Sequence, residues 1–131
     1  MRKLKVLVLT NMFPTSEKPF LGIFVKEQVD SLRKQGVDVD VLFVNGPKNR
    51  LNYLWGIFRL WGRLVTRRYD LIHAHYVFSG IIARLQFMLP VVLTHHGVQV
   101  FTTWERIPCR LITPMVNKVI VMSQEMKDRA R

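Results

Sequence analysis

The sequence predicts an α/β fold built on a doubly wound parallel sheet, and two patterns lead to that prediction. Its short apolar runs show little alternation of polar and apolar residues, as expected of strands buried on both faces. Between them lie segments in which apolar residues recur every three or four positions, the spacing of amphipathic helices. This alternation favours parallel strands joined by helical crossovers. The 131 residues contain no repeats or low-complexity tracts and fit a single domain, residues 1–131.

Five apolar runs are the predicted strands. The first, KVLVLT, is followed by a loop with Pro14 and Pro19, and the second, DVDVLFV, stops at Asn45-Gly46-Pro47. The predicted strands span residues 5–10, 38–44, 70–74, 91–94 and 118–122.

Helical spacing is present between these strands. Glycine is common just past a helix end and proline closes a helix, so these residues set several boundaries. The predicted helices run from Gly22 to Gly36, over 51–67, over 79–89 before Pro90, irregularly between Pro108 and Pro114, and over 124–131 after a cap at Ser123.

Net charge is the compositional outlier, at +11, and one segment carries more than half of the excess. Residues 48–69 hold six Lys and Arg side chains and no Asp or Glu. Such a segment attracts phosphate, from either a nucleic-acid backbone or an anionic lipid. Its cations are Lys48, Arg50, Arg59, Arg63, Arg67 and Arg68.

The N-terminus and the cysteine content bear on the compartment. The apolar run Val6–Leu9 is interrupted by Thr10 and Asn11 before it reaches the length of a signal-peptide core. No window approaches the roughly 20 apolar residues of a membrane span. The single cysteine, Cys109, excludes an internal disulfide and fits a reducing compartment. The sequence therefore predicts a cytoplasmic location.

Polar side chains gather at the predicted carboxyl ends of the strands, where open parallel sheets bind ligands. Asn11 follows the first strand, and the four histidines lie at the ends of the third and fourth strands: His73, His75, His95 and His96. We expect a histidine-lined cleft there, with the rings of His75 and His96 opening into one shared hollow. The alternative is that one or two of these histidines are buried and bonded to backbone groups.

Other chemistries match the sequence poorly. The histidine pairs offer nitrogen ligands, but neighbouring strand residues point to opposite faces and Asp70 begins its strand at the wrong end, so we predict no metal site. The glycine patterns of dinucleotide and phosphate loops are absent from the first turn. No Gly-x-Ser-x-Gly is present, and Cys109 has no histidine near it in sequence.

Five motifs follow one another along nearly the whole chain, from Lys5 to Lys127. They are NMFP (11–14), PFLGIFVKEQ (19–28), YDLIHAHY (69–76), THHG (94–97) and VIVMSQEMK (119–127). Each motif alone is weak, but the ordered set is specific. It resembles the N-terminal domain of the GT4-type, GT-B-fold retaining glycosyltransferases.

The resemblance implies half of an enzyme in which two Rossmann-like domains face each other across a cleft. The N-terminal domain would bind the acceptor, and a C-terminal domain, absent from this chain, would bind the nucleotide sugar. Transfer from a UDP- or GDP-linked donor to a glycan or lipid-linked acceptor, as in polysaccharide or lipopolysaccharide synthesis, would retain the anomeric configuration without a metal or other cofactor. The chain alone would then be inactive, and the gene would continue past Arg131.

The resemblance also implies roles for individual residues. Gly22 lies where the loop and the start of the helix approach the donor phosphates, and backbone amides at a helix start are suited to bind phosphate. The geometry of a helix start alone also explains a glycine at this position. His96 is the catalytic candidate, beside the transferred sugar. Gln99 departs from the family, which often places an acidic residue there. The predicted acceptor- or sugar-binding residues, whose side chains and backbone can hydrogen-bond sugar hydroxyls, are Asn11, His75, His95 and Gly97.

The basic segment leaves two interpretations open. As a helix on an anionic membrane, peripheral to the inner face of the plasma membrane, it would make contact through Arg50, Trp55, Arg59, Trp61 and Arg63. As a helix that covers the sheet, it would bury its apolar face and leave its arginines solvated. The resemblance favours the membrane, and no nucleic-acid-reading motif is present. The apolar face comprises Leu51, Leu54, Trp55, Phe58, Trp61 and Val65, and the opposite one Asn52, Gly56, Arg59, Arg63 and Thr66.

Two other functions stay open at this stage. A free-standing carbohydrate- or lipid-binding module would bind an acceptor without catalysis, and its gene would not continue. A metal-dependent hydrolase would hold stoichiometric zinc that is lost in His75→Ala.

Overall fold

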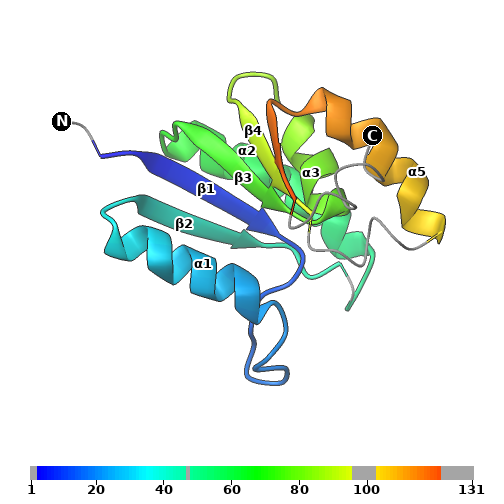
Figure 1. Cartoon of the computed structure of the whole chain (residues 1–131), viewed down its shortest axis with the longest axis horizontal. Helices are drawn as coiled ribbons and strands as arrows, with labels where there is room; N and C mark the ends of the chain where they lie inside the picture. The colour runs from blue at the N-terminus through cyan, green and yellow to red at the C-terminus, as the bar shows by residue number, and fades with distance from the viewer. Residues whose placement is uncertain (1–2, 47, 96–102, 122–131) are drawn as a thin grey trace.

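A computed structural model of the chain describes residues 3–46, 48–95 and 103–121, with the backbone alone for residues 103–106. Its five described strands form one parallel sheet with helices on both faces (Figure 1), which confirms the predicted α/β fold. The elements are β1 (Lys5–Thr10), α1 (Ile23–Lys34), β2 (Asp38–Phe43), α2 (Leu51–Thr66), β3 (Leu71–His75), α3 (Val77–Arg84), β4 (Val91–Thr94), α5 (Thr103–Ile112), a 3-10 turn (Thr113–Met115) and β5 (Lys118–Ile120).

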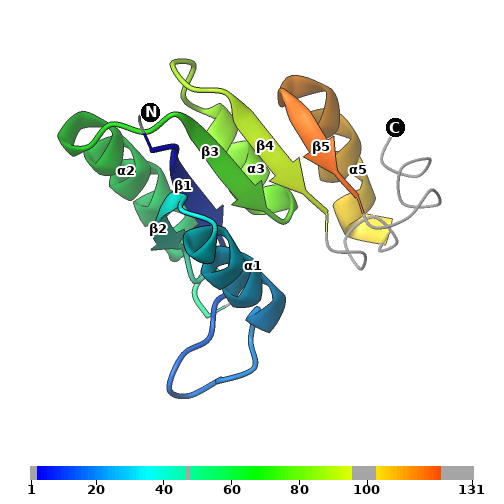
Figure 2. The same cartoon turned by 60° about the vertical axis from the view of Figure 1, so that its left-hand side comes forward.

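The strand order is β2-β1-β3-β4-β5, so the chain winds first to one side of β1 and then to the other. Thr10 of β1 is in register with Phe43 of β2 and with His75 of β3. The strands run in one direction (Figure 2), and these three end level at one edge of the sheet. That edge is where the predicted site residues were expected to meet.

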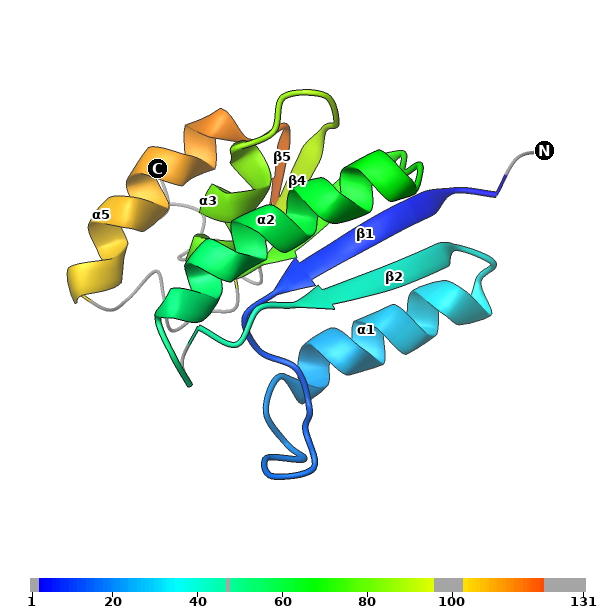
Figure 3. The same cartoon turned by 180° about the vertical axis from the view of Figure 1, so that it is seen from behind.

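The two faces of the sheet bury separate apolar clusters because successive strand residues point to opposite sides. Val6 and Val8 of β1 pack with Val25 of α1. Leu7 and Leu9 face the side that α2, α3 and α5 cover (Figure 3). Burial on both faces explains why the central strands read as continuous apolar runs.

Helix α3 begins two residues earlier and ends five residues earlier than the sequence predicts. Gln86 explains the early end, because its side chain is fully buried and bonds four backbone groups. Its amide nitrogen donates to the carbonyls of Ala83 and Leu89, and its amide oxygen accepts from the N–H groups of Met88 and Leu89. These bonds replace the helical ones and turn the chain towards β4.

The last described elements include the irregular helix predicted before the fifth strand, although it begins at Thr103, five residues before Pro108. Helix α5 contains Pro108, and the 3-10 turn contains Pro114. Strand β5 is three residues long and shorter than expected. The predicted last helix, after Ser123, lies outside the described residues.

Helix α2 packs on the sheet with a second apolar face, which the sequence did not distinguish from the first. Gly56 and Leu60 are buried, and Tyr53, Ile57 and Leu64 pack beside them. A Cβ at Gly56 would lie 2.7 Å from the Val44 side chain, so this glycine lets the helix approach the sheet closely. The interpretation in which the broad apolar face is core is therefore wrong. That face, here called the outer stripe, is exposed by 38–76% at Leu51, Leu54, Trp55, Phe58, Trp61 and Val65.

Candidate functional site

The carboxyl ends of β1 and β3 meet where the winding of the chain reverses. Strand β1 continues through α1 to β2 on one side, whereas β3 lies on its other side. Open parallel sheets bind ligands in the crevice outside such a switch point. The residues that directly follow these strands, Asn11 and Tyr76, therefore define the candidate site.

Asn11 is buried at this edge, with 3% of its surface exposed. Its Nδ2 donates a hydrogen bond to the Tyr53 hydroxyl over 3.1 Å. Its Oδ1 is also buried, and no group in the described part of the chain donates to it. Such an oxygen destabilises a fold by about 1–3 kcal/mol. It is therefore suited to accept a hydrogen bond from a ligand hydroxyl.

Tyr53 lies in the first turn of α2 and holds the Asn11 side chain through this hydrogen bond. The loop after β2 holds its ring, since a Cβ at Gly46 would overlap it. Helix α3 holds it as well, with the Phe78 ring centroid at 5.4 Å. Sequence reasoning missed Tyr53 because it lies 42 residues from Asn11 and reads as an apolar helix residue.

Tyr76 has a backbone conformation that side-chain-bearing residues rarely adopt, with φ 75° and ψ 158°. Such a conformation destabilises by about 1–3 kcal/mol and is concentrated at functional sites. The Tyr76 N–H donates to the Thr94 carbonyl at 3.1 Å, and its carbonyl accepts from the Gly80 N–H at 3.1 Å. Burial raises the pKa of its phenol. No signal in the sequence marks this strain.

Ser79 adds a second unsatisfied acceptor near the same strand end. It lies in the first turn of α3, is 1% exposed, and its Oγ bonds no group among the described residues. A hydroxyl in the first turn of a helix is typical of ordinary capping chemistry, so the sequence alone gives Ser79 no functional signal.

His73 and His75 lie together on the α1 side of the sheet. Their ring centroids are 4.3 Å apart, and His73 Nε2 lies 2.7 Å from Thr94 Oγ1, a hydrogen bond between them. Both are buried, and His75 exposes no surface. The His75 ring therefore does not open into a hollow in this structure. Both histidines are buried, as the alternative expected, and the hydrogen bond of His73 to Thr94 is to a side chain rather than to a backbone group.

His95 lies on the opposite face, against α5, because it directly follows Thr94 on its strand. It is fully buried, and its Nε2 lies 3.7 Å from Cys109 Sγ and 3.3 Å from Thr113 Oγ1. The expectation that the histidines of the two strand ends share one cleft is wrong for His75 and His95, since His75 is in register with Thr94 and His95, the next residue, points to the other face. The fold also brings a histidine to Cys109 that the sequence did not place near it.

Gly22 is the N-cap of α1, with φ 64°. A Cβ there would collide with the Met12 carbonyl and lie 2.8 Å from the Phe13 nitrogen. The helix start therefore packs directly on the loop after β1. Helix-start geometry accounts for this glycine, and its predicted approach to a donor phosphate stays a prediction.

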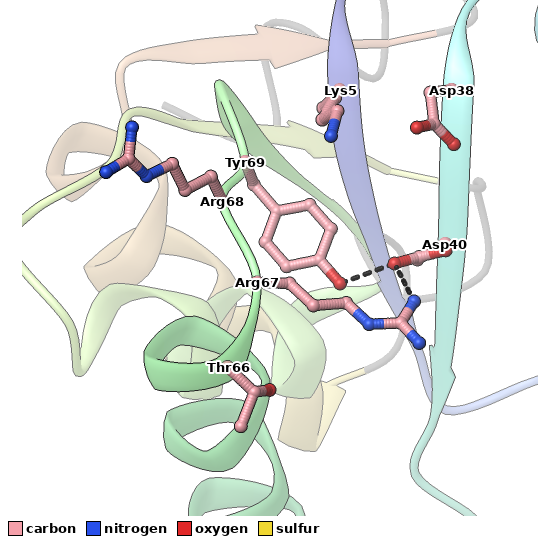
Figure 4. A pocket seen from close by; sticks show the side chains of 7 residues that line it. All are labelled: Lys5, Asp38, Asp40, Thr66, Arg67, Arg68 and Tyr69. Atoms are coloured by element: carbon pink, nitrogen blue, oxygen red, sulfur yellow. Dashed lines mark hydrogen bonds and ion pairs between the residues drawn. The ribbon is translucent and has the colours of Figure 1, made fainter.

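A cavity of about 480 Å³ lies on a different part of the molecule, around the amino-terminal halves of β1 and β2. Its polar groups pair with one another: Asp40 Oδ2 accepts hydrogen bonds from the Tyr69 hydroxyl at 2.6 Å and from Arg67 at 2.8 Å (Figure 4). The Tyr69 bond, with that of Arg67, holds the pKa of Asp40 below its ordinary value. We assign this cluster a structural role, because it ties the end of α2 to β2.

Comparison with protein families matches the chain to Glycosyltransferase Family 4 over residues 5–131. The matched range includes every strand and helix that the structure describes. The chain belongs to Glycosyltransferase Family 4. No curated protein sequence matches it closely enough to add to this assignment.

Membership of Glycosyltransferase Family 4 makes this a glycosyltransferase-type domain, with a fold consistent with the N-terminal half of a GT-B enzyme. It implies interaction with a sugar donor and an acceptor in general. Two predicted site residues, His96 and Gly97, lie outside the described residues, as does Gln99. Asn11 is a predicted site residue with a side-chain oxygen, Oδ1, that accepts no hydrogen bond from the described residues.

Two further properties of this family member concern the described residues alone. Within residues 3–46, 48–95 and 103–121, no three His, Cys, Asp or Glu side chains are grouped so that they could hold a metal ion. None of the described helices combines the length and the apolar character needed to cross a membrane.

The residues predicted to contact a membrane all lie on or beside α2. Arg50, Trp55, Arg59 and Trp61 are exposed, and Arg63 is partly exposed. An Arg59 N–H donates to the Phe43 carbonyl at 2.8 Å, and this bond directs the Arg59 side chain towards the end of β2.

Proposed function

We propose that this chain is the acceptor-side domain of a retaining glycosyltransferase. The enzyme transfers a sugar from a UDP- or GDP-linked donor to a glycan or lipid-linked acceptor, in the synthesis of a polysaccharide or lipopolysaccharide. The observation that carries the proposal is the Glycosyltransferase Family 4 match along residues 5–131. The buried, unsatisfied Asn11 oxygen at the switch point supports an acceptor site at that edge.

In this proposal, Asn11 Oδ1 accepts a hydrogen bond from an acceptor hydroxyl. Tyr53 keeps that oxygen in position, because it holds the amide nitrogen of the same side chain. His96 and Gly97 follow β4 and contact the transferred sugar. His75 and His95 are fully buried, so they position the strand ends from the two faces of the sheet rather than touching the sugar.

The donor is held between two domains. The start of α1, at Gly22, approaches the donor phosphates, and a second Rossmann-like domain binds the nucleotide. The residues of this chain alone therefore bind an acceptor but do not complete a transfer. A reducing cytoplasm suits the single, buried cysteine.

The experiment is a transfer assay on the gene product that contains this chain, with a panel of radiolabelled UDP- and GDP-sugars and lipid and glycan acceptors. We expect transfer with retained anomeric configuration, determined by NMR of the product. Asn11→Ala should lower kcat/KM about tenfold to a hundredfold, as for one lost hydrogen bond. Gln35→Ala, at an exposed position at the far end of α1, should leave it unchanged.

Two outcomes contradict the proposal. Inverted configuration in the product would exclude the retaining mechanism. Acceptor binding without transfer of any sugar would identify the chain as a binding module, the alternative that the sequence left open.

A further inference from the structure

We propose that the outer stripe of α2 is a docking surface for an anionic lipid bilayer. The stripe consists of six large apolar side chains, two of them tryptophans, and Trp55 and Phe58 at its centre are 64% and 63% exposed. Soluble monomers rarely expose a contiguous apolar surface of this kind without a partner. The question is which partner fits it.

The shape of the stripe fits a plane. Helix α2 has 16 residues and is therefore about 24 Å long. Outer-stripe residues recur every three or four positions from Leu51 to Val65, so they follow one side of the helix over its whole length. The inner side, with Gly56 and Leu60, is already packed on the sheet. The stripe is thus a convex ridge on the outside of the domain.

The charges around the stripe fit an anionic surface. Arg59 and Arg63 lie along one flank of the helix, Lys48 and Arg50 precede it, and Arg68 follows it. Among the six cations of residues 48–69, the described structure pairs only two with carboxylates: Arg67 with Asp40 at 2.8 Å and Lys48 with Glu17 at 3.8 Å. Of the other four, Arg59 donates to the Phe43 carbonyl and Arg63 lies against Tyr69, so Arg50 and Arg68 are the cations left for lipid headgroups, each attracted by the surface potential.

Other partners fit these observations less well. Two copies joined by their outer stripes would bring their cationic flanks within a Debye length of about 8–10 Å and repel. Nucleic acid would match the cations but not six aliphatic and aromatic side chains. Tryptophan and arginine side chains together are typical of the headgroup layer of a bilayer. There the apolar parts of the side chains contact acyl chains, and the polar ends contact headgroups and water.

The surface also has a consequence for the acceptor, which rests on the proposed function. The first turn of α2 carries Leu51, Leu54 and Trp55 on its outer side and Tyr53, bonded to Asn11, on its inner side. A bilayer under the stripe therefore lies within one helix diameter of the candidate site. An acceptor anchored in lipid could enter the site without leaving the membrane.

Vesicle sedimentation tests the docking independently of sugar transfer. The chain should bind vesicles of phosphatidylcholine with phosphatidylglycerol at least about tenfold more tightly than vesicles of phosphatidylcholine alone, and salt should weaken the binding. Trp55→Gln with Phe58→Gln should reduce binding at least about tenfold. Phe87→Gln with Met88→Gln is the matched control, because these side chains are 84% and 65% exposed elsewhere on the molecule.

A second pair of variants distinguishes the effect of the basic segment on vesicle binding from the effect of the net positive charge of the chain. Arg50→Gln with Arg68→Gln should weaken binding about tenfold or more, and Lys18→Gln with Lys34→Gln removes the same charge from exposed positions elsewhere and should have a smaller effect. Brominated lipids should quench Trp55 fluorescence in a chain with Trp61→Phe and Trp104→Phe.

The proposal is overturned if binding is equal for neutral and anionic vesicles, or if the chain binds neither. It also fails if each test pair behaves like its control, or if analytical ultracentrifugation shows a dimer that Trp55→Gln with Phe58→Gln dissociates. Loss of transfer with vesicle binding intact would instead count against the proposed function alone.

Discussion

The Nδ2 atom of Asn11 and the hydroxyl of Tyr53 lie 3.1 Å apart, and this hydrogen bond joins the carboxyl end of β1 to the first turn of α2. It leaves Asn11 Oδ1 as a buried acceptor with no described donor. The bond therefore links the candidate site to the helix that carries the outer stripe, and in this structure it uses the amide nitrogen and leaves the amide oxygen.

Tyr53→Phe should test this link. The ring keeps its packing on Gly46 and Phe78, while Asn11 Nδ2 loses its acceptor, so we expect a loss of about 1–2 kcal/mol in the free energy of unfolding by urea. A double-mutant cycle with Asn11→Ala should give a coupling energy of about 1 kcal/mol. Additive effects of the two substitutions would show that the bond contributes nothing to stability.

Three glycines make a graded series in which backbone conformation and free space vary separately. Gly22→Ala meets both a positive φ and the backbone of Met12, and should destabilise by about 2 kcal/mol or more. Gly36→Ala has φ 90° but nothing within 4 Å, and should cost about 1 kcal/mol. Gly62→Ala, helical and uncrowded, should stabilise by up to about 1 kcal/mol. Thermal unfolding ranks all three, and a Gly22→Ala effect no larger than that of Gly36→Ala would contradict the packing on Met12.

Asp40 should contribute to acid sensitivity. The Tyr69 hydroxyl and Arg67 lower its pKa in the folded chain from the ordinary value of 3.8, so the unfolded chain binds the proton more readily. The resulting stabilisation is complete well above pH 3.8 and declines as the pH falls through 3.8 towards the folded pKa. Urea unfolding between about pH 7 and pH 3 should show a smaller acid-induced loss in Asp40→Asn than in the native chain.

Asp30→Asn is the matched control for that titration. Asp30 also has a lowered pKa, from its hydrogen bond with Lys26, but this pair is exposed on α1 and screened by solvent. Its substitution should hardly change the acid dependence. If both variants follow the same curve as the native chain, the Asp40 cluster has no effect on stability.

The sequence was sufficient for the fold because its signals are local. Apolar runs such as KVLVLT, and Gly36 just past the end of a predicted helix, follow from backbone sterics and burial that need no partner. The early end of α3 was not predictable, because it depends on Gln86 bonding backbone groups on both sides of a turn. A polar residue in an apolar pattern does not show whether its side chain is buried.

The candidate site and the face of α2 needed tertiary information. Helix α2 is apolar on two sides, and periodicity alone does not say which one packs; the close approach of Gly56 to Val44 decides it. The histidines likewise follow neighbouring strands in sequence, but His75 and His95 point to opposite faces of the sheet. Asn11 could be predicted as a candidate because it directly follows a strand at the edge where parallel sheets bind ligands, and its role there stays a prediction.

The reactivity of the Cys109 thiol tests whether α5 covers the face of the sheet on which His95 lies. The thiol is 1% exposed and packed between His95 and Thr113, so a disulfide reagent reaches it only when α5 opens from the sheet. We expect Cys109 to react with Ellman's reagent at least about a hundredfold more slowly in the folded chain than in urea, with a rate that follows local opening rather than thiol chemistry. The control is Lys34→Cys in a Cys109→Ala chain, whose exposed thiol should react at the same rate in both conditions. Equal rates for Cys109 and this control thiol in the folded chain would mean that α5 does not cover the β4 edge, and would remove His95 from its buried position.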